Sequence, residues 1–126
     1  MAVDTMGNLL TVVVHSAGIQ DRAGARAVLI RLHCAFTTIK TVFVDGGYSG
    51  VLIDWTLAMF GWTMQVVKRT EQHKFVVLPK RWIVERTLSW LGWSRRLSKD
   101  YEVLPCNAEA FVQIAMIHLL LRRATR

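Results

Sequence analysis

The 126-residue chain is about half apolar, and its 16 Lys and Arg against nine Asp and Glu leave a formal net charge of +7. This size and composition fit one compact domain, residues 1–126, and exclude a disordered chain, which would be poor in aromatic and branched aliphatic residues. Cys34 and Cys106 stand outside any CxxC motif, so the sequence predicts neither a disulfide framework nor a zinc site. The first ten residues lack the charged start and apolar stretch of a signal peptide, and we expect a cytoplasmic protein.

The basic excess lies entirely in the second half of the chain. Residues 1–67 contain four basic and four acidic side chains, whereas residues 68–126 contain twelve basic and five acidic ones. A one-sided positive field favours a polyanionic partner, and nucleic acid is the commonest polyanion in a cytosol. Charge alone does not distinguish a surface that binds nucleic acid from a basic surface that contacts only solvent.

In chain order, the first half alternates strands and helices. The pattern predicts a hairpin of residues 2–5 and 9–15, a helix over 21–36, a strand over 41–44, a helix over 49–60 ended by Gly61, and a strand over 63–67. We expect Asp21 to cap the first helix, with an apolar face formed by Ala23, Ala27, Ile30 and Cys34. Such an alternation is typical of an α/β fold whose strands are parallel in part.

The second half is predicted to be mainly helical. We expect a loop over 70–80, a helix over 80–93 with Val84, Leu88 and Leu91 on its apolar face, a basic connector over 94–105, and a helix over 107–123 capped by Asn107. The apolar stretch Phe111 to Leu121 is well short of the roughly 20 residues that cross a membrane, so it is interpreted as a core helix. Trp82, Trp90 and Trp93 are more typical of packing than of base stacking, and the four histidines show no metal-ligand spacing.

Two carboxylates stand out by their predicted positions. Asp45 ends a strand and precedes two glycines, and catalytic groups of α/β sheets gather at the carboxyl ends of strands. Glu85 lies on a helix with Arg81 four residues earlier, on the same face. A strand carboxylate and a helix carboxylate can together hold divalent metal ions for phosphodiester cleavage. By spacing alone, Asp45 with its two glycines is more typical of a turn than of a catalytic site. Arg81 with Glu85 is likewise more typical of a surface ion pair.

The segments VFVDGGYSG, RWIVERTLSWLGWSRRLSKDYE and HLLLRR resemble the corresponding blocks of bacterial insertion-sequence DDE transposases, mobile-element enzymes. The resemblance implies a ribonuclease-H-like mixed sheet flanked by helices, with Asp45 as the second catalytic carboxylate and Glu85 as the third. It also implies Mg²⁺ or Mn²⁺ as cofactor, DNA ends and target DNA as partners, no membrane, and a homo-oligomer in the full-length form.

The family motif around the glutamate matches only in part. Arg81 and Glu85 occupy their positions, which implies a catalytic role for both, but Leu78 stands where the family has Tyr and Gly92 where it has Lys. Arg95, Arg96 and Lys99 follow closely in the sequence, and we expect them to supply the positive charge that contacts the DNA backbone.

The first carboxylate of the family lies on a strand that would precede the hairpin, and Asp4 resembles a later, non-catalytic position. We therefore expect an incomplete domain that lacks its first strand. Two alternatives stay open. One is an inactive remnant that binds DNA or another subunit. The other is an unrelated α/β enzyme, although the nucleotide fingerprints GxGxxG and GxxxxGK[ST] are absent from the sequence.

Overall fold

The computed structural model describes residues 1–48, 50–67 and 81–126, apart from the side chain of Arg81. The chain divides into two compact units, which are described separately below. Unit 1 consists of Met1–Ile19 and Ile83–Arg126, and unit 2 of Gln20–Trp82. The predicted loop over 70–80 lies outside the described residues.

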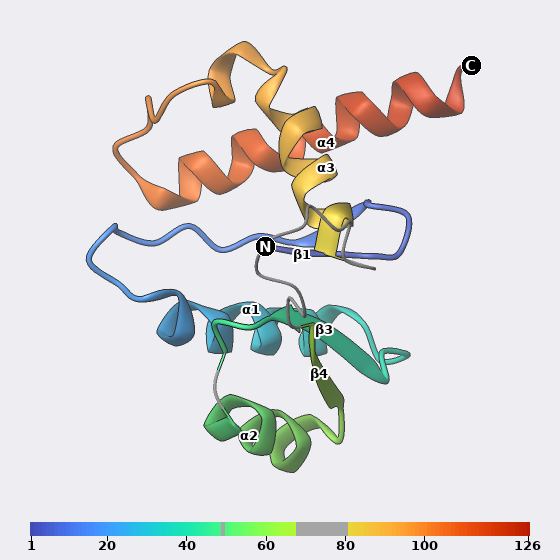
Figure 1. Ribbon diagram of the computed structural model, residues 1–126. Coiled ribbons are helices and arrows are strands. Elements are labelled where there is room, and N and C mark those ends of the chain that lie inside the picture. The colour runs from blue at the N-terminus through green and yellow to red at the C-terminus, as the bar shows by residue number, and fades with distance from the viewer. Residues whose placement is uncertain (49, 68–80) are drawn as a thin grey trace, which may run out of the picture. The chain divides into compact units, whose positions relative to one another are not determined.

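Unit 2 is built around a parallel pair of strands, β3 (Thr41–Asp45) and β4 (Thr63–Val67), joined through helix α2 (Gly50–Phe60) and accompanied by helix α1 (Asp21–Ala35) (Figure 1). The register runs from Thr41 opposite Thr63 to Asp45 opposite Val67. Gly61 has φ +68° and its N–H donates to the carbonyl of Leu57 at 2.9 Å, which ends α2. The mixed α/β character and the four elements predicted here are confirmed.

Two predictions for α1 are wrong. The buried residues are Gly24, Leu29 and Leu32, whereas the predicted apolar face of Ala23, Ala27, Ile30 and Cys34 is exposed. Burial of a leucine removes more apolar surface from water than burial of an alanine, so the two leucines decide which face packs. Asp21 is the first helical residue rather than the cap. The N-cap is Gln20, without a side-chain hydrogen bond.

The buried core side chains of unit 2 come from α1, α2, β4 and the residue before β4. Leu29 and Leu32 of α1, Leu52 of α2, and Met64 of β4 are buried together with Trp62. Beside this core, His33 stacks on Phe60 with ring centroids 4.6 Å apart, and Phe60 contacts Trp62 at 5.0 Å. His33 therefore has a packing role, as expected for a histidine without metal-ligand spacing.

Unit 1 combines the two ends of the chain. An antiparallel hairpin, β1 (Ala2–Val3) and β2 (Leu9–Thr11), accompanies helix α3 (Arg81–Gly92), the short helix η1 (Arg95–Leu97) and helix α4 (Pro105–Ala124) (Figure 1). The strands are shorter than predicted. Among the described residues the four strands form two separate two-stranded sheets.

Helix α4 starts earlier than predicted. Its N-cap is Leu104 and Pro105 is its first residue, so the assignment of Asn107 as cap is wrong. Proline is favoured in the first helical turn because the N–H that it lacks would have no intrahelical partner there. In the described part of the chain, no helix is long and apolar enough to cross a membrane.

The turn of the hairpin packs closely against α3. Gly7 has φ +84°, and a Cβ atom there would come within 2.9 Å of Thr87 Oγ1. The fully buried Thr87 hydroxyl lies 2.8 Å from the carbonyl of Gly7, to which it donates, and Arg86 Nη2 donates to the carbonyl of Met6 at 2.9 Å. Only a residue without a side chain allows this approach.

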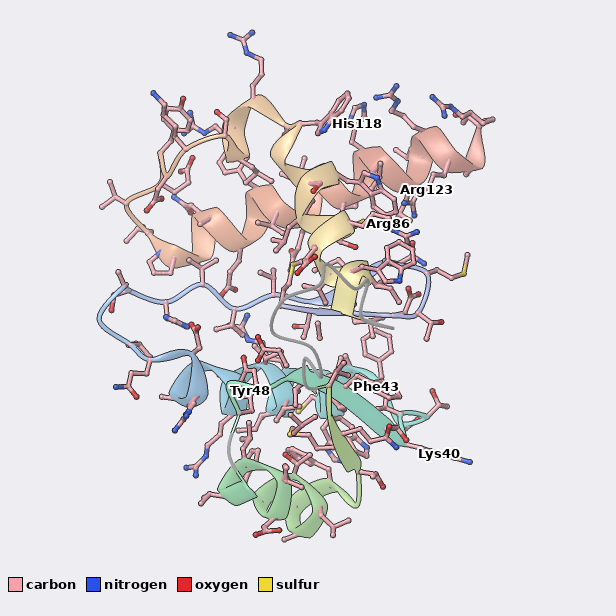
Figure 2. All side chains as sticks on the ribbon, viewed as in Figure 1. Lys40, Phe43, Tyr48, Arg86, His118 and Arg123 are labelled. Carbon is pink, nitrogen blue, oxygen red and sulfur yellow. The ribbon has the colours of Figure 1, made fainter. Side chains whose placement is uncertain are left out.

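Two arginines stack on Trp90 and tie α3 and α4 to the same turn. The guanidinium carbon of Arg86 lies 4.6 Å and that of Arg123 4.1 Å from the Trp90 ring centroid, and Figure 2 shows both side chains beside the turn. Arg123 Nη1 also donates to Asn8 Oδ1 at 3.1 Å. We call Arg86, Trp90 and Arg123 the arginine–tryptophan clamp. The packing role predicted for Trp90 agrees with it, whereas Trp93 is 89% exposed.

Candidate functional site

Asp45 lies at the carboxyl end of β3, where the sequence predicted a strand end. Its side chain is exposed, and its Oδ1 accepts a hydrogen bond from the N–H of Gly47 at 3.1 Å. A Cβ atom on Gly47 would stand 3.3 Å from this oxygen. The turn after β3 therefore orients the carboxylate while leaving it accessible to solvent.

Three residues that were not predicted as site residues lie around this turn. Arg22 Nε donates to the carbonyl of Gly47 at 3.0 Å, which ties the start of α1 to the turn. Burial raises the pKa of the Tyr48 phenol, and the negative charges of Asp45 and Asp21 raise it further. Figure 2 shows Tyr48 near the start of α1 in unit 2. Tyr48 could have been noticed in VFVDGGYSG, but no local pattern links the start of α1 to this turn.

Glu85 lies on α3, on the side opposite to the residues that pack in unit 1. Ile83 and Thr87 are buried, whereas Glu85 and Leu88 are exposed, so the predicted apolar face of α3 is wrong at Leu88. Thr87 takes the buried position instead of Leu88, because its hydroxyl donates a hydrogen bond to the carbonyl of Gly7 in the hairpin turn. Arg81 begins α3, and its side chain lies outside the described part of the structure.

The two predicted metal ligands belong to different units. Asp45 is part of unit 2 and Glu85 part of unit 1. Among the residues that the structure describes, no group of three or more His, Cys, Asp or Glu side chains is placed to hold a metal ion. That the two carboxylates share a metal stays a prediction.

The predicted DNA-binding residues lie on and directly after η1. Arg95 and Lys99 are exposed. Arg96 is about half exposed, its Nε donates to Glu102 Oε1 at 2.6 Å, and its guanidinium carbon lies 5.0 Å from the ring centroid of Phe111. Arg96 thus links the connector to α4, and Glu102 is its ion-pair partner.

A family model described as a transposase DDE domain matches residues 1–120 of the chain. The matched segment includes Asp45, Glu85 and the predicted DNA-binding residues, and it ends within α4. No curated protein and no solved structure matches the chain.

Proposed function

Because this chain belongs to the family of transposase DDE domains, we propose that it is the catalytic portion of a bacterial insertion-sequence transposase with a ribonuclease-H-like fold. Its reaction would cleave and join phosphodiester bonds at the ends of the mobile element. The observation that carries the proposal is the accessible carboxylate of Asp45 at the end of a parallel strand, within the segment that matches the family.

Asp45 and Glu85 would hold Mg²⁺ or Mn²⁺. Both are exposed carboxylates, and hard divalent cations prefer oxygen ligands while keeping several waters. When bound, such ions stabilise the attacking and leaving oxygens of a phosphodiester displacement. The N–H of Gly47 donates to one oxygen of Asp45, which orients the carboxylate. Arg81 is proposed to stabilise negative charge on the DNA near Glu85.

Arg95 and Lys99 are proposed to contact DNA phosphates. Both are exposed on a segment that lies in the basic half of the chain. Arg96 would contribute less to DNA binding than its neighbours, because its guanidinium is already paired with Glu102. The role of Arg96 is then mainly to hold η1 on α4.

DNA binding is tested by fluorescence anisotropy with a labelled duplex over a range of salt concentrations. We expect the double substitution Arg95→Gln and Lys99→Gln to weaken binding to all sequences and to lower the salt slope by about 0.9 for each phosphate that is no longer neutralised. The matched control removes two charges elsewhere, by Lys40→Gln and Arg126→Gln, and should leave the slope nearly unchanged. Equal effects of the two pairs would mean that net charge alone drives binding.

Catalysis is tested by nicking of supercoiled plasmid DNA with Mg²⁺ or Mn²⁺. We expect metal-dependent nicking to require the carboxylate of Asp45, so Asp45→Asn should abolish this activity. DNA binding without nicking would instead favour the alternative, an inactive DNA-binding remnant.

A further inference from the structure

The turn that follows β3 is held from outside by one side chain. We call residues 45–48 the Asp45 turn. Within it, the N–H of Gly47 donates to Asp45 Oδ1 at 3.1 Å. From α1, Arg22 Nε donates to the carbonyl of Gly47 at 3.0 Å. In the described part of the chain, no other side chain from outside the turn hydrogen-bonds to its peptide groups.

The sequence of the Asp45 turn makes such an anchor necessary. Gly46 and Gly47 are adjacent, and glycine has more backbone freedom than any other residue. A Cβ atom at Gly46 would meet nothing within 4 Å, and one at Gly47 would meet Asp45 Oδ1 at 3.3 Å. Side-chain packing therefore does not hold these two glycines, and their conformation depends on hydrogen bonds.

Arg22 extends from a rigid part of unit 2. It is the second residue of α1, and the N–H of Gly24 closes the first helical turn by donating to the carbonyl of Gln20 at 3.1 Å. Further along the same helix, Leu29 and Leu32 are buried in the core of unit 2. The hydrogen bond from Arg22 thus connects a freely jointed turn to a helix that the core keeps in place.

We propose that Arg22 is a positioning residue for the Asp45 carboxylate. By holding the carbonyl of Gly47, it keeps this glycine in the orientation in which its N–H meets Asp45 Oδ1. The carboxylate is then presented to a divalent cation in one direction. The inference rests on the proposed function, which supplies the cation.

A direct contact between Arg22 and a DNA phosphate is the main alternative. Two carboxylates argue against it, because Asp21 precedes Arg22 in the chain and Asp45 belongs to the turn that Arg22 holds. Both negative charges also act on Tyr48, where they raise the pKa of the phenol. In the absence of a cation these charges repel a phosphate, whereas they do not repel the neutral carbonyl of a peptide group.

Exchange of the Gly47 amide proton with water, followed by NMR spectroscopy of the whole isotope-labelled chain, tests the positioning without metal. We expect Arg22→Met to raise the exchange rate severalfold, because the turn loses its anchor. Arg22→Lys keeps a charged donor and should restore most of the protection. The matched control is Arg26→Met on the same helix, where the guanidinium carbon lies 5.4 Å from the ring centroid of Trp55. It should leave the exchange rate of Gly47 unchanged.

Broadening of the amide signals around Asp45 by Mn²⁺ tests the consequence for the metal site. Loss of a positive charge beside a cation site would by itself strengthen Mn²⁺ binding, since like charges repel. We expect the opposite, a severalfold weaker binding in Arg22→Met, because Asp45 loses its orientation. Arg22→Lys should restore the binding. Tighter binding in Arg22→Met would overturn the proposal, because Arg22 would then act through its charge alone.

The two measurements separate this inference from the proposed function. Unchanged exchange of the Gly47 amide proton in Arg22→Met would overturn the inference even if Mn²⁺ binds. Weaker DNA binding together with unchanged exchange would assign Arg22 to a phosphate instead. Absence of Mn²⁺ broadening near Asp45 in the unsubstituted chain would contradict the proposed metal site, and the exchange rate would still decide whether Arg22 holds the turn. The dispersion of the NMR spectrum verifies that each variant is folded.

Discussion

At the scale of single residues, Gly7 stands where the packing of the hairpin turn leaves no room for a side chain. A Cβ atom there would meet Thr87 Oγ1 at 2.9 Å, Arg86 Nη2 at 3.0 Å and the Trp90 ring at 3.2 Å, on a backbone with φ +84°. We expect Gly7→Ala to lower the free energy of unfolding by about 2 kcal/mol or more, because left-handed strain and overpacking add. Thermal denaturation checks this.

Gly18→Ala is the matched control for this substitution. A Cβ atom at Gly18 meets nothing within 4 Å, and its backbone is not left-handed. We expect a change within about 0.5 kcal/mol, or a small gain from reduced freedom of the unfolded chain. Equal losses of stability at the two glycines would show that the turn does not pack on α3 as described.

Tyr48 predicts how stability responds to alkaline pH. Burial and the nearby Asp45 and Asp21 raise the pKa of its phenol in the folded chain. As the pH rises above about 10, the unfolded chain ionises first, so the stability contributed by the neutral phenol declines until the folded pKa is passed. Urea unfolding across this pH range, with a chelator present to remove metal ions, measures the free energy of unfolding. It should decline less with pH in Tyr48→Phe than in the unsubstituted chain. An identical decline would mean that Tyr48 titrates alike in both states.

At the scale of elements, the arginine–tryptophan clamp joins α3, α4 and the hairpin through one ring. We expect Trp90→Ala to lower the free energy of unfolding by about 2–3 kcal/mol, since it removes a half-buried ring and two stacked cations worth about 0.5–1 kcal/mol each. The control is Trp93→Ala, three residues later and 89% exposed, which should change stability by less than about 0.5 kcal/mol. Chemical denaturation measures the free energy of unfolding of both variants.

The elements were predictable from the sequence, but which faces they bury was less so. Alternating β-branched runs and helical periods located β3, α2 and β4 to within one residue, and with them the strand end that carries Asp45. Local patterns do not encode which of two apolar faces meets a partner. The apolar face of α1 and Leu88 of α3 are therefore misassigned, and Ile114, Ile117 and Leu121 of α4, which lie in the stretch interpreted as a core helix, are exposed.

The surroundings of the candidate site depend on contacts between distant segments. The hydrogen bond from Arg22 to Gly47 spans 25 residues, and that from Thr87 to Gly7 spans 80. Neither hydrogen bond corresponds to a periodic pattern in the sequence, because each forms only when the elements pack. The resemblance to a family assigned roles to Asp45 and Glu85, but it could not predict the ion pair that engages Arg96.

At the scale of the whole molecule, the proposed function requires Asp45 of unit 2 and Glu85 of unit 1 to approach one another. We expect nitroxide labels at Asp45→Cys and Glu85→Cys, in a chain with both native cysteines replaced by serine, to give a short and narrow distance distribution. The control pair uses Lys40→Cys, five residues before Asp45 and about 16 Å away along the strand. A longer distance from Glu85 to position 45 than to position 40 would contradict shared metal binding.

The composition of unit 1 from both ends of the chain also determines when it can form during synthesis. The partners of the hairpin turn lie 80 residues away at Thr87 and 115 residues away at Arg123, so they leave the ribosome long after the hairpin does. Residues 20–82 include both strands and both helices of unit 2 and can pack earlier. Until α3 and α4 have been synthesised, the hairpin lacks the helices against which its turn packs, and in this interval a chaperone would have most to protect.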